Sequence, residues 1–493
     1  MAVTVIRFTL FAPRTKYIPQ ACQGASTRRH PTARPAPGFP SPAPPPKFPR
    51  PFPPPMLLPQ LRSLLGLLLI VALCWALSRD RRAVAWRLVA WGLALQLLFG
   101  ALVLLTPTGT AFFAAVNDAL LGVLRFAEAG ARFLFGDLIF NNVPVGTGVA
   151  GGNAPLAAPG TQVARTGAYF AFHVLPTIIF FSSLMAVLYH LRLMQRVVHG
   201  VAWVMQRTMR TSGAETLATA GGIFVGLMET PLLVRPYLAR MTRSEVFALM
   251  VAGLASISGG LLVAYVGLLS PFFPDIGGHL VSASFMSAPA ALVVAKLLYP
   301  ETEPAETRQA LPVEAEAGSD VNVIDAAGRG AIEGLFMALK VGAMLIAFLG
   351  LLEMANALVA WVGAQAGYPA LSLQRMLGIV AAPVAWLVGV PWADARAVGE
   401  LIGVKTVLNE FIAYRQFADL LDGPHPFAPR SIVLASYALA GFANFGSIAM
   451  QVAGMGELAP EKRGLLAALG MRALLGGLLV GLMTAAVAGI LVP

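Results

Sequence analysis

The chain has 493 residues, of which 57% are hydrophobic and 12% charged, and its mean hydropathy is +0.72. Soluble globular proteins carry a charge on about 25% of their residues, so this composition excludes an ordinary soluble protein and indicates a membrane protein. The net charge of +11 does not indicate a nucleic-acid partner, because residues 1–55 hold eight Lys and Arg residues and no acidic residue. The two cysteines, Cys22 and Cys74, lie far apart and indicate neither a disulfide framework nor a thiolate metal site.

Residues 1–55 contain 15 of the 37 prolines, as in PAPGFPSPAPPPKFPRPFPPP. A segment of this composition cannot form a packed core, and we expect it to be disordered. Two interpretations stay open, a polyproline ligand for a partner protein and an unstructured tail. A start site assigned too early would also explain the segment, because Met56 is followed at once by the apolar run LLPQLRSLLGLLLIVALCWAL.

Apolar runs long enough to span a bilayer recur along the rest of the chain. None shows the alternation of a β-barrel strand, so the sequence predicts an all-α polytopic membrane protein with about eight transmembrane helices. The predicted spans are residues 58–78, 83–105, 169–190, 245–270, 279–299, 333–360, 430–456 and 464–491.

Three connecting segments have a character of their own. Residues 110–136 are amphipathic and are predicted to form an interfacial helix. Residues 141–167 are rich in Gly, Ala and Pro and are predicted to be a loop. Residues 300–330 are polar and acidic and are predicted to be an exposed linker.

The order of elements repeats. Residues 169–299 and 331–493 each contain a span, a shorter piece, a segment with one carboxylate, and two further spans. The Lys- and Arg-rich stretches place the two series in opposite orientations, with the mature N-terminus outside. This order predicts an inverted repeat, with a substrate site near the midplane at the repeat interface. Residues 56–168 are then the scaffold.

The stretch GGIFVGLMETPLLVRP, residues 221–236, carries one carboxylate, Glu229, in an apolar setting. Its flanks are too short to span, so residues 213–239 are predicted to form a re-entrant hairpin that enters the membrane and turns back. Gly226 permits a tight turn, Thr230 is a good N-cap and Pro231 a good first helical residue. Residues 395–420, with Glu410, are predicted to form a second hairpin.

Each glutamate alone has a simpler explanation, since a carboxylate near the end of a span can reach out to water. Two carboxylates in matching segments, with Asn409 beside Glu410, favour a binding site. Ionisable groups at membrane depth are costly and usually mark transport pathways.

Small residues and hydroxyls interrupt two of the spans, in LASISGG (residues 254–260) and GFANFGS (residues 441–447). Such stretches let a helix unwind, and the freed carbonyls and hydroxyls are oxygen ligands suited to a small cation. Close packing of helices is the alternative. Asn444 is harder to explain by packing, because its amide needs hydrogen-bond partners.

From Met56 to the C-terminus the sequence resembles the concentrative nucleoside transporter family, bacterial branch. The resemblance rests on TSGAETL, PLLVRPYLARMTRSE, LNEFIAY and YALAGFANFGSIA. It implies a multi-pass protein of the bacterial inner membrane that forms a homotrimer, with eight spans, two re-entrant hairpins and interfacial helices per subunit. It also implies cation-coupled nucleoside uptake by an elevator-like alternating-access movement, with no cofactor beyond a coupling Na⁺ ion.

The resemblance also implies a substrate site. In the family the first hairpin tip reads GQTEAP and contacts the nucleobase; here it reads GLMETP, and only the Glu keeps its type. The ribose-binding Glu, the base-stacking Phe and the ribose-contacting Asn and Ser are all present. The implied substrate-binding residues are Leu227, Met228, Glu229, Glu410, Phe442, Asn444 and Ser447. The polar groups lost from the base half predict a shifted base preference, towards purines or a modified nucleoside.

The family's sodium site matches Gly222, Val225, Ser256 and Ile257, which would contribute mainly backbone carbonyls and the Ser hydroxyl. The family has an Asn where this chain has Gly222. The loss of one ligand leaves both Na⁺ and H⁺ open as the coupling ion.

Two other classes of function are alternatives to transport. A membrane-embedded hydrolase would need a nucleophile–base pair or a metal motif, and the sequence contains no HExxH, P-loop or nucleophile elbow, so we expect no enzyme. A nucleoside-binding sensor, or a transporter of a non-standard substrate, stays open as the alternative to nucleoside symport.

Overall fold

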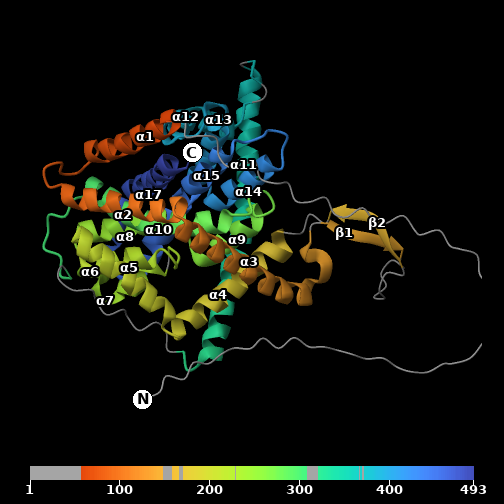
Figure 1. Ribbon diagram of the computed structural model, residues 1–493, viewed down its shortest axis with the longest axis horizontal. Coiled ribbons are helices and arrows are strands. Elements are labelled where there is room, and N and C mark those ends of the chain that lie inside the picture. Colours follow the sequence, from red (N-terminus) through yellow and green to blue (C-terminus); the bar gives the residue numbers. More distant parts are fainter. Residues whose placement is uncertain are drawn as a thin grey trace, which may run out of the picture. The chain divides into compact units, whose positions relative to one another are not determined.

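The computed structural model describes residues 57–140, 142–147, 158–165, 170–227, 229–307, 320–365, 367–368 and 371–492. Within these residues the chain is almost entirely helical (Figure 1). The predicted tail 1–55 lies outside the described residues, as does the middle of the predicted linker.

Eight helices in the described part of the chain are long and apolar enough to cross a membrane. They are α1 (Leu57–Ala76), α2 (Trp86–Leu105), α3 (Pro107–Phe135), α4 (Leu175–His190), the broken helix α8 (Arg243–Ala255) and α9 (Gly259–Leu269), α10 (Ile276–Leu298), α11 (Val323–Gln365) and α17 (Arg463–Leu491). The prediction of an all-α polytopic membrane protein is confirmed.

The predicted interfacial helix 110–136 is α3, which together with the turn Gly136–Ile139 also has the length and hydropathy of a span; its position at the membrane interface stays a prediction. The predicted span 430–456 is broken at its GFANFGS stretch into α15 (Pro429–Leu439) and α16 (Phe445–Leu458). Neither half can cross a bilayer alone, because a span needs about 20 residues.

Two connecting segments also differ from expectation. The predicted loop 141–167 contains an antiparallel strand pair, β1 (Asn142–Thr147) and β2 (Ala158–Arg165). The alternating valines of NVPV are typical of a strand, and the surrounding Gly and Pro hid that signal. The predicted linker 300–330 ends early, because the Asn322 side chain accepts hydrogen bonds from the amides of Ile324 and Asp325 and starts α11 at Val323.

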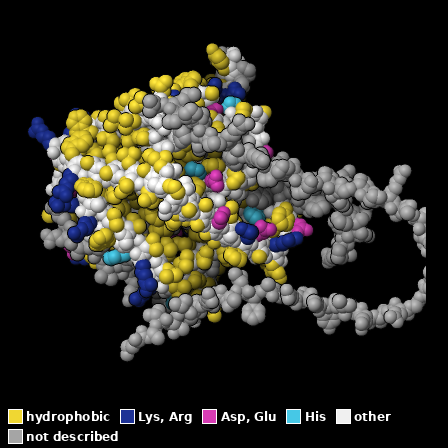
Figure 2. Space-filling view, viewed as in Figure 1, with side chains coloured by type: hydrophobic (Ala, Val, Ile, Leu, Met, Phe, Trp, Pro, Cys, Tyr) yellow, Lys and Arg dark blue, Asp and Glu magenta, His cyan; other side chains and the backbone are white. Residues whose placement is uncertain are grey.

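The helices separate into an inner and an outer set. In the most apolar part of each helix, 94% of the residues of α8–α9 and 89% of those of α10 are buried, against only 18% in α11. α10 and α17 lie side by side and contact α2, α8 and α15 (Figure 1). Outside them, α1, α2 and α11 expose large apolar side chains, and Figure 2 shows a face covered largely by such groups with Lys and Arg along its left edge. An apolar face with charges at its margin is what a lipid bilayer requires.

Two helix–turn–helix segments occupy the predicted hairpins. The first comprises α6 (Gly213–Gly221), the 3-10 turn Thr230–Val234 and α7 (Arg235–Leu238); the amphipathic α5 (Leu193–Met209) precedes it. The second comprises α13 (Trp392–Val407) and α14 (Glu410–Leu421), and α12 (Leu373–Val388) meets α13 at a bend of 119°. Their insertion into the membrane as re-entrant hairpins stays a prediction.

A buried carboxylate anchors the base of each hairpin to a helix later in the chain. Glu215, in the first turn of α6, lies 2.7 Å from the ammonium group of Lys296 near the end of α10. Asp394, in the first turn of α13, accepts hydrogen bonds from Ser431 on α15 at 2.5 Å and from the His425 ring at 2.8 Å. Removing one partner of such a buried pair costs several kcal/mol, so both bases are firmly attached.

Candidate functional site

Two broken helices touch at their breaks. α8 ends at Ala255 and α9 starts at Gly259, while α15 ends at Leu439 and α16 starts at Phe445. Gly441 has φ +105°, a conformation that favours glycine, and a Cβ atom there would lie 2.7 Å from the Ala255 carbonyl oxygen. The small residues predicted to unwind both helices therefore also let the two breaks come into direct contact.

Glu410 is the centre of a buried polar cluster. It is the first residue of α14 and is 5% exposed. One carboxylate oxygen accepts a hydrogen bond from the Tyr265 hydroxyl at 3.1 Å, and the other accepts one from the Asn444 amide at 3.0 Å. The cluster thus joins α9, α14 and the α15–α16 break.

Two asparagines fix the ends of the half-helices at this cluster. The Asn409 side chain accepts a hydrogen bond from the Ile412 amide at 2.8 Å and caps α14. The Asn444 side-chain oxygen does the same for the Ser447 amide at 2.8 Å and caps α16. The positive ends of both helix dipoles therefore point toward the Glu410 carboxylate and stabilise its charge.

A buried lysine donates hydrogen bonds to the carbonyl groups at the α15–α16 break. Lys405, near the end of α13, is 1% exposed, and its ammonium group donates to the carbonyl oxygens of Ala438 and Ala440 at 3.0 and 3.1 Å. The ring of Tyr414 stacks on Tyr265 with a centroid distance of 4.3 Å. These contacts hold the second hairpin against the break that carries Asn444.

The first hairpin lies along the other break. The Phe224 carbonyl accepts a hydrogen bond from the Gly259 amide at 3.1 Å, and a Cβ atom at Gly222 would lie 3.6 Å from Cβ of Ser256. The structure therefore brings together Gly222 and Ser256, two of the four residues expected at the cation site. Among the described residues, no backbone amide donates to the carbonyls of Val225, Ser256 and Ile257. Such free oxygens suit a small hard cation.

The tip of the first hairpin is compact. A Cβ atom at Gly226 would meet the Glu229 carboxylate and lie 3.1 Å from Cβ of Ser258, so a side chain there would displace that carboxylate. The expectation that Thr230 is an N-cap was wrong: it is the first residue of the 3-10 turn, and its hydroxyl donates back to the Gly226 carbonyl at 2.8 Å. Leu227 is buried beside Gly253, and Met228 lies outside the described residues.

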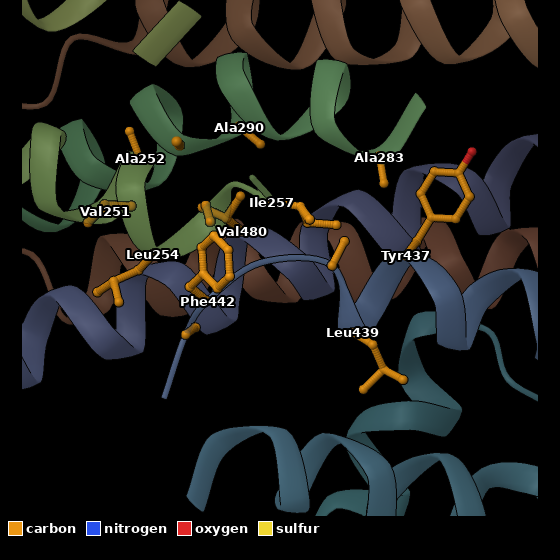
Figure 3. Packing of buried hydrophobic residues seen from close by; sticks show 14 of the residues in the cluster. Val251, Ala252, Leu254, Ile257, Ala283, Ala290, Tyr437, Leu439, Phe442 and Val480 are labelled. Atoms are coloured by element: carbon orange, nitrogen blue, oxygen red, sulfur yellow. The ribbon is translucent and has the colours of Figure 1, made fainter. Parts of the chain in front are cut away.

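The remaining expected residues line the second break. Figure 3 shows the ring of Phe442 between Leu254 and Ile257, on the side of the α8–α9 break. Ser447 is fully buried, and its hydroxyl has no hydrogen-bond partner among the described residues. The hydroxyl of Ser258 is also buried and also lacks a partner there. Buried polar atoms are usually paired, so two unpaired hydroxyls on the two breaks are suited to a polar ligand.

Known proteins with this sequence and fold are transporters. The family described as Na⁺ dependent nucleoside transporter matches with its N-terminal part at residues 65–138 and its C-terminal part at residues 279–489, and a nucleoside recognition (Gate) family matches residues 171–272. An uncharacterized transporter of Haemophilus influenzae is 39% identical over 435 residues, 88% of this chain and 98% of that protein. This chain belongs to the concentrative nucleoside transporter family.

Other members extend the comparison. Sodium/nucleoside cotransporter 1 of Rattus norvegicus is 40% identical over 88% of this chain, which spans 64% of the rat protein. The structure of CNTnw in an inward-facing substrate-bound state superposes with a TM-score of 0.77 at 40% identity, covering 88% of this chain and 98% of that one. A CNTnw variant in an outward-facing state gives 0.79, at 40% identity and 88% and 99% coverage. The relatives are cotransporters and not enzymes.

Sequence reasoning missed three side chains of this transporter's polar cluster. Tyr265 is the one hydroxyl in an otherwise apolar α9, Lys405 precedes Glu410 by five residues, and Gln451 lies two turns after Asn444. Gln451 is buried and donates to the Met250 carbonyl at 3.0 Å. Each was an isolated polar residue in an apolar run, which is a signal, but only the fold shows which of them meet.

The contact between the breaks can be tested with Gly441→Ala. The added methyl group meets the Ala255 carbonyl in a backbone conformation that disfavours it, so we expect the free energy of unfolding to fall by about 2 kcal/mol. Thermal unfolding of the purified protein in detergent measures this through exposure of the buried Cys74 thiol to a dye, in a Cys22→Ser background.

Gly464→Ala is the matched control, because Gly464 is exposed in α17 and nothing lies within 4 Å of its added methyl group. Its free energy of unfolding should change by less than about 0.5 kcal/mol. Equal stability of the two variants would contradict the packing of Gly441 against Ala255.

Proposed function

We propose that this protein carries nucleosides into the cell by cation-coupled symport across the bacterial inner membrane. The observation that carries the proposal is the buried Glu410 carboxylate, held between Tyr265 of α9 and Asn444 at the α15–α16 break. Membership of the family and the Na⁺/nucleoside cotransport named for its relatives support the same conclusion.

The polar cluster suits the ribose. An ionised carboxylate offers about four acceptor positions, and Tyr265 and Asn444 use two of those on Glu410. The others can accept the hydroxyl groups of a sugar. The unpaired Ser447 hydroxyl lies one turn along α16 from the Asn444 cap and can donate or accept a further hydrogen bond.

The base half of the site is more apolar. Phe442 offers a ring for stacking, and Leu227 and Met228 stand at the hairpin positions expected to contact the base. Glu229 is the one acidic group there. A site with few hydrogen bonds discriminates weakly between polar base edges, so we propose a base preference shifted towards purines or a modified nucleoside.

The cation would couple to the substrate through one short turn. Gly222 lies against Ser256, Phe224 accepts a hydrogen bond from the Gly259 amide, and residues 227–229 follow directly at the hairpin tip. A cation bound by the free carbonyls and the Ser256 hydroxyl would fix the backbone that positions the base contacts. Each ligand would then raise the affinity for the other, which is the requirement for symport. We favour Na⁺, with H⁺ as the alternative.

The movement proposed is that of the two repeats, 169–299 and 331–493, against the scaffold 56–168 by alternating access. We also propose the homotrimer implied by the family. The large apolar surface of α11, which is mostly exposed in a single subunit, offers room for subunit contacts as well as lipid. Native mass spectrometry in detergent tests the assembly.

Replacement Glu410→Gln tests the ribose site. In cells that lack their own nucleoside uptake, we expect the wild type to accumulate labelled nucleosides under a Na⁺ gradient. The variant loses hydrogen bonds to a charged acceptor, worth about 1.5–3 kcal/mol, so its apparent affinity should fall roughly 10- to 100-fold. Glu353→Gln, on the exposed surface of α11, is the control and should transport normally.

Each outcome is informative. Unchanged uptake by Glu410→Gln would remove Glu410 from the site. Binding of nucleosides to the purified wild type without any accumulation in cells would favour the sensor instead of the symporter.

The base preference can be tested with the double replacement of Leu227 by Gln and Met228 by Thr. Restoring two hydrogen-bonding groups at the hairpin tip should raise the apparent affinity for uridine about tenfold relative to wild type. Leu232→Gln changes an exposed leucine just beyond the tip and should have no effect. Competition of unlabelled nucleosides against a labelled one measures the change, and equal uridine affinity in all three proteins would count against the proposal.

The cation site can be tested with Gly222→Asn. A Cβ atom at Gly222 would lie 3.4 Å from the Thr219 carbonyl oxygen and 3.6 Å from Cβ of Ser256, which is ordinary contact, so the side chain fits. Its amide oxygen adds a ligand, and the Na⁺ concentration for half-maximal uptake should fall several-fold. Gly222→Ala fills the same space without a ligand and should behave as wild type. Uptake that ignores Na⁺ in every variant and stops with a protonophore would identify H⁺ as the coupling ion.

A further inference from the structure

The carbonyl groups at the two helix breaks have different hydrogen-bond partners. At the α8–α9 break, the carbonyls of Ser256 and Ile257 receive no hydrogen bond from a backbone amide in the described part of the chain. At the α15–α16 break, the carbonyls of Ala438 and Ala440 receive two hydrogen bonds from one ammonium group, that of Lys405.

The ammonium group of Lys405 is surrounded by carbonyl oxygens, as a bound monovalent cation would be. The carbonyl oxygens stand at the C-terminal end of α15, where the helix dipole is negative. The third side is closed by α17, where a Cβ atom at Gly481 would lie 3.5 Å from the ammonium nitrogen and 3.1 Å from the Ala438 oxygen. The side chain is almost completely shielded, so water cannot replace these contacts.

We propose that the ammonium group of Lys405 is a tethered substitute for a coupling cation at the second break. Resting on the proposed cation-coupled symport, the inference adds that only the first break takes an exchangeable ion. The ammonium group belongs to α13, and the Asn409 cap and Glu410 follow within five residues. It therefore ties the second hairpin permanently to the break that carries Asn444.

The two hairpins would therefore differ in whether their attachment needs a bound ion. The contact of Glu410 with Asn444 is held without an ion, because Lys405 cannot leave. The first hairpin has no such tether: one backbone hydrogen bond, from Gly259 to Phe224, and the packing of small residues hold it against the α8–α9 break, and a bound ion would strengthen that contact. One exchangeable cation per nucleoside follows, and the first hairpin is the part of the site that opens when that ion dissociates.

The test is chemical rescue of Lys405→Ala. This variant leaves space beside two carbonyl oxygens, and we expect its unfolding temperature in choline chloride to fall well below that of wild type. Added Na⁺ or methylammonium should restore much of the loss. Lys405→Met fills the space with an apolar chain of similar length, and neither cation should rescue it. Methylammonium should leave the wild type unchanged.

Uptake gives an independent readout. The Hill coefficient for Na⁺ should rise from about 1 in the wild type to nearly 2 in Lys405→Ala, because a second exchangeable site has been opened. Stabilisation of Lys405→Ala by the cations no greater than that of Lys405→Met would overturn the proposal.

The wild type alone supplies a further test if Lys405→Ala does not fold. The ratio of transported charge to nucleoside should be one, and a ratio of two would overturn the proposal. The unfolding measurements need no transport. Rescue without any nucleoside uptake would therefore refute the symport and leave the cation-like role of Lys405 intact, whereas uptake without rescue would do the reverse.

Discussion

A carboxylate buried among apolar helices must be paired, and the arrangement around Glu410 follows from that requirement. Its partners come from Tyr265 and Asn444, which stand 145 and 34 positions away in the sequence. To reach it, Asn444 must lie outside regular helix, so α15 and α16 cannot be one span. The α15 carbonyls released by this break would in turn be unpaired without Lys405. One buried charge thus accounts for a broken helix, two helix caps and a buried lysine.

The hairpins are rigid at one end and adaptable at the other. A buried ion pair between Glu215 and Lys296 holds the base of the first hairpin, and a hydrogen bond from Ser431 to Asp394 holds that of the second. At the tip of the first hairpin the contacts to the α8–α9 break are one backbone hydrogen bond and close packing of small residues. Local opening of the site is therefore expected at this tip, within the larger movement proposed for the two repeats.

Much of this fold could be predicted from the sequence, because long apolar runs have few alternatives in a membrane. The helix breaks were also visible, since LASISGG and GFANFGS place small and polar residues where a continuous helix would expose them. The strand pair was missed because local composition was ambiguous there. The partners of Glu410 were missed for another reason. Tyr265 and Lys405 look like isolated polar residues until tertiary packing brings them to one point, and no local pattern encodes that distance.

The length of α11 has a consequence for how the protein sits in a bilayer. Its 43 residues extend about 65 Å, roughly twice the thickness of a hydrocarbon core. Arg329 pairs with Asp320 and Glu333 at 2.7 Å each, so the first turns stay in the aqueous phase. The remaining apolar part is still about 45 Å long and fits only with a steep tilt. Because α11 packs along α4 and is otherwise largely exposed, a thinner or thicker membrane would change that tilt before it disturbed the buried helices (Figure 1). A change in membrane thickness would therefore alter the tilt of α11 and leave the polar cluster around Glu410 unchanged.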